Sequence, residues 1–244
     1  MRRYYREGFE VRDKVYFNPR SSNKQNIDTS LGKKDFEPRV TKINDNVVVY
    51  SAYAKASKNS EEIQIILNAL KGKSKYKVEI DPESYELFIK RTSFFFWHLV
   101  KDFPIDTIIT IESSSGLSDD LKNSLLDRLP YDIIEYDEGV KKNLDFASYW
   151  IETEKISPES LKKIQSDIRR MEKSGYFKIH EINLTFRRFV RNWLKIDEDV
   201  REGITGKNVL IIDDFLTSGT TMREAVRLIS DVGANKIWAI TILK

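Results

Sequence analysis

The sequence contains no cysteine among its 244 residues, which excludes disulfide bonds and thiolate–metal sites. It contains only two histidines, His98 and His180, and two isolated histidines without cysteine do not make a transition-metal site. A Gly-x-Ser-x-Gly elbow is missing, so a Ser-His-Asp hydrolase has no support. The longest apolar run, 94–100, is too short to span a bilayer, and the N-terminus lacks the apolar segment of a signal peptide. We therefore expect a cytoplasmic protein with no membrane partner.

Hydrophobic residues make up 40% of the chain and aromatic residues 11%, which is the composition of a folded protein. The net charge of +3 is unevenly distributed, because residues 1–60 carry +6 and the remaining residues carry −3. This basic quarter could attract phosphate-bearing partners, although a solvated arm is the commoner role of such a run. Residues 18–45 are rich in Asn, Ser, Lys and Asp and predict a loop or an extended arm.

Apolar periodicity, capping residues and proline positions predict the other elements. Helices are expected from residue 60 and at 82–101, 118–129, 158–174 and 221–232, and strands at 47–50, 106–111, 131–136, 177–184, 209–212 and 236–243. Residues 137–156 show no regular pattern. Strands and helices alternate from residue 106 onward, which predicts an α/β fold with a mostly parallel sheet and helices on both faces.

One segment, residues 209–221, has the features of an anion-binding site. The apolar strand Val209–Ile212 is followed by Asp213 and Asp214, at the carboxyl end of a strand where ligands bind in open α/β sheets. An ordinary capped turn needs only one hydroxyl residue, and paired acids on a buried strand cost desolvation unless a ligand uses them. The loop that follows leads directly into a helix, whose first backbone N–H groups can bind an anion. The residues of this loop are Phe215, Leu216, Thr217, Ser218, Gly219, Thr220 and Thr221.

Residues 209–221 resemble the phosphoribosyl pyrophosphate (PRPP) signature of type I phosphoribosyltransferases almost position for position. Phe215 stands where a smaller aliphatic residue is commoner, although xanthine-type members also use Asp-Asp-Phe-Leu. The resemblance implies that Asp213 and Asp214 hold the ribose 2′- and 3′-hydroxyls and that residues 217–221 hold the 5′-phosphate. It also implies a type I phosphoribosyltransferase fold, with a twisted, mostly parallel sheet in a core at residues 101–244. Residues 1–100 would then form an N-terminal extension and hood.

Two further segments resemble the same family less specifically. A turn after the strand 106–111 is similar to its pyrophosphate loop with one extra residue, although a serine-rich connection is the ordinary alternative; it consists of Glu112, Ser113, Ser114, Ser115 and Gly116. Lys141 and Lys142 occupy the place where the family puts a basic residue near the pyrophosphate, and a solvated lysine pair fits equally well. Residues 137–185 are expected to form a lid and a helical insertion longer than the family's loop.

The reaction that the resemblance implies is transfer of the ribose 5-phosphate of PRPP to a nucleobase or similar nitrogen acceptor, with release of pyrophosphate. Asp213, Asp214 and Lys142 would be the catalytic residues, and Mg²⁺ would be held by the two acids indirectly, through PRPP and water. A homodimer is compatible with the sequence.

The alternative is a regulator with the same fold that senses PRPP or a nucleotide and binds nucleic acid. The basic N-terminal arm and the basic, aromatic segment 186–193 would serve it, although the ordinary role of that segment is an amphipathic one. We do not favour nucleic acid as the partner at this stage. A PRPP-synthesising relative has less support, because no ATP-binding feature is visible.

Overall fold

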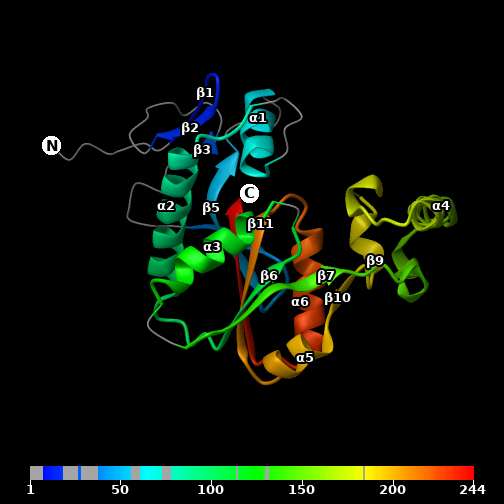
Figure 1. Cartoon of the computed structure of the whole chain (residues 1–244). Coiled ribbons are helices and arrows are strands. Elements are labelled where there is room, and N and C mark those ends of the chain that lie inside the picture. The colour runs from blue at the N-terminus through cyan, green and yellow to red at the C-terminus, as the bar shows by residue number, and fades with distance from the viewer. Residues whose placement is uncertain are drawn as a thin grey trace.

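The computed structural model describes residues 8–18, 27–28, 38–55, 61–72, 78–113, 115–129, 132–183 and 185–244. The strands of the main sheet in these residues are β3 (Ile27–Asp28), β4 (Arg39–Lys42), β5 (Val48–Lys55), β6 (Thr107–Ile111), β7 (Ile134–Lys142), β10 (Leu194–Ile196), β11 (Asn208–Phe215) and β12 (Lys236–Leu243). Their order is β10-β7-β6-β11-β12-β5-β3, with β4 also pairing with β5 (Figure 1). The five inner neighbours from β7 to β5 are parallel, and β10, β3 and β4 are antiparallel additions. The predicted mostly parallel α/β sheet is therefore confirmed.

Helices cover both faces of this sheet, as the alternation of elements predicts. Apolar residues of one core cluster come from α1 (Glu61–Leu70), α2 (Pro82–Val100) and α3 (Leu117–Leu126), and those of the other from α5 (Glu198–Ile204) and α6 (Thr220–Asp231). Alternate residues of β11 face the two layers, with Leu210 and Ile212 in the first cluster and Val209 and Ile211 in the second. All four side chains are fully buried, so β11 is central to the core on both faces.

Capping residues explain where α2 and α4 (Pro158–Ser174), the two longest of the described helices, begin and where α4 ends. The side chain of Asp81 accepts a hydrogen bond from the backbone N–H of Ser84 at the start of α2. Ser157 does the same for Ser160 at the start of α4, and Gly175 ends that helix in the left-handed conformation with φ of 68°. No helix among the described residues is long and apolar enough to cross a membrane.

The N-terminal part of the chain is built onto the same sheet and helices. The hairpin of β1 (Gly8–Val11) and β2 (Val15–Asn18) packs on α2, with the rings of Phe9, Phe17 and Phe88 at centroid distances of 5.1 to 5.3 Å. The basic residues of the predicted arm at positions 2–6 lie outside the described residues. β4 falls inside the predicted loop 18–45, and the loop prediction is wrong there because Arg39–Lys42 finds a partner in β5. Since β5 pairs with β12, the sheet spans both sides of the boundary expected at residue 100.

The segment between β7 and β10 forms the insertion, which stands to one side of the sheet next to α6 (Figure 1). It contains α4, the two-stranded pairing of β8 (Trp150–Ile151) with β9 (Val190–Arg191), and four 3-10 turns at Phe146–Ser148, Thr153–Lys155, Ile179–Glu181 and Arg187–Phe189. The segment 186–193 is thus a turn followed by a short strand, with Phe189, Val190 and Trp193 buried.

Two predictions in this region are wrong. The second strand does not end at residue 136, because Val140–Lys142 pairs with β10 and extends β7 through residues that we expected to be irregular. Residues 177–183 do not form a strand either. Phe177 and Ile182 are buried in the insertion's core around a 3-10 turn, with the Phe177 ring packed against Tyr149 and Trp193, so their apolar character reflects packing without strand pairing. Residue 184 lies outside the described residues.

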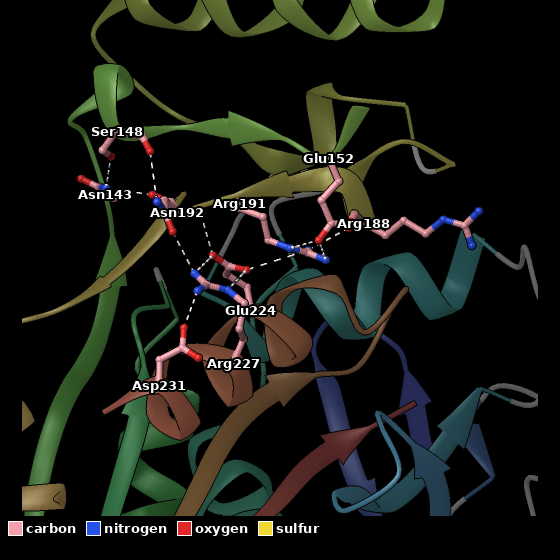
Figure 2. Close-up of polar contacts among 9 residues, drawn as sticks. All are labelled: Asn143, Ser148, Glu152, Arg188, Arg191, Asn192, Glu224, Arg227 and Asp231. Atoms are coloured by element: carbon pink, nitrogen blue, oxygen red, sulfur yellow. Dashed lines mark hydrogen bonds and ion pairs between the residues drawn. The ribbon is translucent and has the colours of Figure 1, made fainter. Parts of the chain in front are cut away.

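A buried carboxylate joins the insertion to α6 (Figure 2). Glu224 is 1% exposed and accepts hydrogen bonds from the backbone N–H of Asn192 at 2.7 Å and from Arg227 at 2.8 and 3.1 Å. Arg227 also donates to the Asn192 side-chain oxygen at 2.9 Å. The Asn192 carbonyl accepts from Asn143 at 2.8 Å, so both ends of the insertion meet at this point. Asn192 holds φ of 61°, a left-handed conformation that asparagine tolerates better than most residues.

Replacing Glu224 with Gln should destabilise the protein by about 2–3 kcal/mol, because hydrogen bonds to a charged group contribute about 1.5–3 kcal/mol and Gln cannot accept all of them. Urea unfolding followed by circular dichroism measures the change. Glu202→Gln, which removes an exposed carboxylate, is the matched control and should stay within about 0.5 kcal/mol of the wild type. Equal effects of the two substitutions would show that the Glu224 contacts do not hold the insertion in place.

Candidate functional site

The candidate site lies at the carboxyl end of β11, where the two predicted acids are found. β11 runs through Phe215, further than the predicted end at Ile212, because β12 continues to pair with it as far as Leu243. Asp213 and Asp214 therefore belong to the strand itself, and each is only 6% exposed. Two adjacent carboxylates at the end of a central parallel strand are held where α/β proteins bind their ligands.

Asp214 is the meeting point of three separate segments of the chain. Its Oδ2 atom accepts hydrogen bonds from the hydroxyls of Ser113 at 2.9 Å and Ser115 at 3.1 Å. The same oxygen lies 3.2 Å from Nζ of Lys71, which follows the end of α1 and also lies 4.4 Å above the ring of Phe215. The structure thus brings the predicted pyrophosphate loop to the predicted ribose-binding acids.

Lys71 is a site residue that the sequence analysis missed. It comes from the segment expected to form the hood, and nothing in its immediate sequence marks it, apart from the helix stop provided by Gly72 with φ of 61°. The Lys71 side chain is 27% exposed, so it remains accessible from the site while it contacts the carboxylate.

Asp213 is the acid whose charge is less well compensated. Its Oδ1 atom accepts a hydrogen bond from the backbone N–H of Asp214 at 2.9 Å. Burial raises the pKa of the Asp213 carboxyl, and the negative charge of Asp214 raises it further, against the lowering effect of that backbone bond and of Lys71. Without a ligand, the pair therefore tends to hold a proton.

The predicted phosphate loop begins α6. Gly219 has φ of 72° and precedes the first residue of the helix, a left-handed conformation that glycine adopts at no steric cost. The hydroxyls of Ser218 and Thr220 lie 2.9 Å apart, and Arg223 donates to the Ser218 carbonyl at 2.9 Å. These contacts fix the loop around the N-terminus of the helix, where backbone N–H groups lack partners within the helix.

The other residues assigned to this loop have different surroundings. Thr217 is exposed and Thr221 is partly buried. The side chain of Leu216 is 4% exposed in the apolar core, and its backbone N–H donates to the Leu243 carbonyl at 2.8 Å. Leu216 therefore anchors the loop to the sheet, and its side chain is not available to a ligand.

The predicted pyrophosphate loop is tied to β7 through Glu112. Its carboxylate accepts from the backbone N–H of Lys142 at 2.7 Å and from the Lys142 side chain at 3.0 Å. Burial opposes ionisation of Glu112, but these two bonds and the lysine charges hold its pKa below the usual value. Gly116 has φ of 64° at the start of α3. Ser114 lies outside the described residues.

The two lysines of β7 have different positions. Successive residues of a strand point to opposite sides, and Lys142 contacts Glu112 whereas Lys141 binds Asp197, at the start of α5, at 2.7 Å. Of the two predicted lysines, Lys142 therefore contacts the predicted pyrophosphate loop, whereas Lys141 points to the start of α5.

The acids offer a limited set of metal ligands. Among the described residues, no group of three or more His, Cys, Asp or Glu side chains could hold a metal ion. Two buried carboxylates fit an ion that keeps most of its ligands from water and substrate phosphates, which is the usual behaviour of Mg²⁺.

Comparisons with known proteins bear on this site. The family model described as "Phosphoribosyl transferase domain" matches residues 163–244, a range that contains β11, the loop and α6. The match confirms the predicted resemblance to phosphoribosyltransferases in this part of the chain, and the mostly parallel sheet agrees with the predicted fold.

Individual relatives match shorter or more distant parts. The amidophosphoribosyltransferase of Staphylococcus aureus is 42% identical over 38 residues, which cover 16% of this chain and 8% of that protein. A hypoxanthine phosphoribosyltransferase structure from Staphylococcus aureus is 15% identical with a TM-score of 0.38, over 64% of this chain and 62% of that one. A hypoxanthine-guanine phosphoribosyltransferase structure from Bacillus anthracis is 15% identical with a TM-score of 0.35, over 64% and 63% of the chains.

The raised pKa of Asp213 predicts how stability depends on pH. The folded state binds a proton that the unfolded chain releases near pH 4, so the ionisation of Asp213 lowers stability progressively as pH rises above about 4. Asp213→Asn removes this ionisation. In the absence of ligand, we expect its melting temperature to rise relative to the wild type as pH increases from about 4 to about 8.

Scanning calorimetry at a series of pH values measures this difference. Asp102→Asn, at an exposed carboxyl, is the control and should show no such trend. A constant difference between Asp213→Asn and the wild type across the range would mean that Asp213 ionises normally.

Proposed function

We propose that this protein is a phosphoribosyltransferase that transfers the ribose 5-phosphate of PRPP to a nucleobase-like nitrogen acceptor and releases pyrophosphate. The observation that carries the proposal is the contact of Ser113 and Ser115 with Asp214. Through this contact, the serine-rich loop at the N-terminus of α3 lies beside the two acids that precede the N-terminus of α6. A ligand in which a ribose joins a phosphate to a pyrophosphate matches the start of α6, the two acids and the loop before α3.

Each part of PRPP then has a group to receive it. The 5′-phosphate would bind the backbone N–H groups and hydroxyls of residues 217–221 at the start of α6. The ribose hydroxyls would donate to Asp213 and Asp214, and would replace the serine hydroxyls that now occupy Oδ2 of Asp214. The pyrophosphate would lie along residues 112–116, close to Lys142 and Lys71.

The reaction breaks the bond between C1 of the ribose and the pyrophosphate oxygen, which keeps the electron pair. The acceptor nitrogen bonds to C1 and gives its proton to solvent. Positive charge develops at C1 in the transition state, and the carboxylates of Asp213 and Asp214 favour it more than they favour the ground state. Mg²⁺ bound with PRPP would neutralise charge on the leaving pyrophosphate. The residues of this chain mainly position the ligand and supply the field.

The name of one relative supports the same class of reaction. The amidophosphoribosyltransferase of Staphylococcus aureus, which matches 38 residues of this chain, is named for phosphoribosyl transfer. We propose a nucleobase-like acceptor for this chain.

Binding of PRPP with Mg²⁺ should stabilise the folded protein. At a free ligand concentration of about 100 times its dissociation constant, the gain is about 2.7 kcal/mol. Thermal unfolding with increasing PRPP measures it, and ribose 5-phosphate and pyrophosphate, tested separately, show which half of the site binds. An unchanged melting temperature with all three ligands contradicts a PRPP site at β11.

The acids should matter more for turnover than for binding. We expect the wild type to release pyrophosphate from PRPP with at least one acceptor of a nucleobase panel. We expect kcat of the Asp213→Asn/Asp214→Asn double variant to fall more than about tenfold, or 1.4 kcal/mol, because the charge at C1 develops only in the transition state. Pyrophosphate release measures kcat, and PRPP titration measures binding. Tight PRPP binding without turnover on any acceptor would identify a PRPP-sensing regulator, and an unchanged kcat in the double variant would place the active site elsewhere.

A further inference from the structure

The insertion contains a groove that the proposed reaction does not use. Its volume is about 370 Å³, and it lies between residues 146–153 and α4. One wall carries the aromatic side chains of Phe146, Tyr149 and Trp150, and the other includes Leu161 and Ile168 of α4. Trp150 is 47% exposed, which is unusual for the largest apolar side chain. The groove therefore offers flat aromatic surface to a ligand from solvent.

A row of positive charges continues from this groove along α4. A second hollow, of about 430 Å³, shares Gln165 and Arg169 with the first and is otherwise lined by Lys162, Ser166, Arg170 and Lys173. No apolar side chain lines it. All six residues are exposed on one side of the helix, and from Lys162 to Lys173 they extend about 16 Å at 1.5 Å per residue.

Most of these charges have no internal partner. Arg170 lies 3.4 Å from Asp167 and 3.5 Å from Glu181. Lys162, Arg169 and Lys173 make no ion pair or side-chain hydrogen bond within the part of the chain that the structure describes. Three uncompensated cations beside an aromatic groove form a surface that is complementary to an anionic ligand with planar rings.

We propose that this surface binds a single-stranded nucleic acid. One base stacks on the aromatic wall at Trp150, and the phosphates of the neighbouring nucleotides follow the cations of α4. An acidic amphipathic peptide fits less well, because such a peptide needs apolar contacts along its length and the groove has them only at one end. The segment 186–193, which the sequence suggested for this role, lines neither hollow.

The surface is separate from the PRPP site, so the inference does not rest on transferase activity. It belongs to 146–153 and α4, whereas the PRPP site belongs to the ends of β6, β11 and α1. The two are connected through α6, whose first residues form the phosphate loop and whose Glu224 holds Asn192 of the insertion (Figure 2).

Fluorescence anisotropy with labelled single-stranded oligonucleotides of about 12 nucleotides tests the proposal, since sites of this kind cover about 4–16 nucleotides. We expect the logarithm of the binding constant to fall with the logarithm of salt concentration between about 50 and 200 mM, by about 0.7 per phosphate neutralised. The variant Lys162→Gln/Arg169→Gln/Lys173→Gln should bind at least about tenfold more weakly and lower this slope by about 2. Lys14→Gln/Lys207→Gln/Lys244→Gln changes the net charge equally at other exposed positions and should leave both values nearly unchanged.

Substitution of Trp150 gives a second test, because it removes the stacking surface without changing the charge of the protein. Trp150→Ala should weaken binding about tenfold without changing the salt slope, and Trp150→Phe, which keeps a stacking ring, should restore most of the affinity. Circular dichroism melting verifies that each variant is folded. Equal weakening by the two triple variants, or no effect of Trp150→Ala, would overturn the proposal. So would binding of a Glu-rich peptide at this surface when oligonucleotides do not bind.

Discussion

Two carboxylates, Asp213 and Asp214, lie side by side and buried at the carboxyl end of β11. Burial of like charges is unfavourable unless other groups compensate them. The compensation for Asp214 comes from Ser113 and Ser115, in the loop between β6 and α3, and from Lys71 after α1. These segments are far apart in the sequence and meet at Asp214. The geometry of the candidate site therefore follows from the need to satisfy one buried oxygen. Asp213, whose Oδ1 atom accepts the backbone N–H of Asp214, keeps a raised pKa because burial and the charge of Asp214 outweigh that bond and Lys71.

The helix α6 connects this site to the insertion. Its N-terminus follows Gly219 and carries the loop that we assign to the phosphate, and Glu224, on the next turn, receives the backbone of Asn192. The insertion, which carries the aromatic groove and the cations of α4, is joined to α6 by this contact and shares an apolar core cluster with α6 and the sheet. A change in the loop that tilts α6 would therefore also move the insertion, because the buried, charged hydrogen-bond network around Glu224 joins the two.

Local signals in the sequence predicted what local physics decides. The capping residues Asp81 and Ser157 and the stop at Gly175 gave helices that begin and end within a residue or two of the structure, and the pattern at 209–221 indicated the strand, the acids and the helix start. Partners that are distant in the chain decided the rest. The end of β7 depends on β10, the burial of Phe177 depends on Tyr149 and Trp193, and the place of Lys71 depends on Asp214. An ion pair between residues so far apart leaves no periodicity or spacing that a single sequence could reveal.

The order of strands in the sheet has a consequence for synthesis on the ribosome. β11 and β12, at residues 208–243, lie between β6 on one side and β5 on the other, so β5 and β6 do not pair with each other in the sheet. While the chain is being made, β5 and β6 present unpaired inner edges, and the apolar layer of α1, α2 and α3 lacks the β11 and β12 side chains that complete its core cluster. Such topologies fold slowly and expose edges that pair with other chains. A ribosome-bound chain of this protein would therefore depend on chaperones until the centre of its sheet emerges.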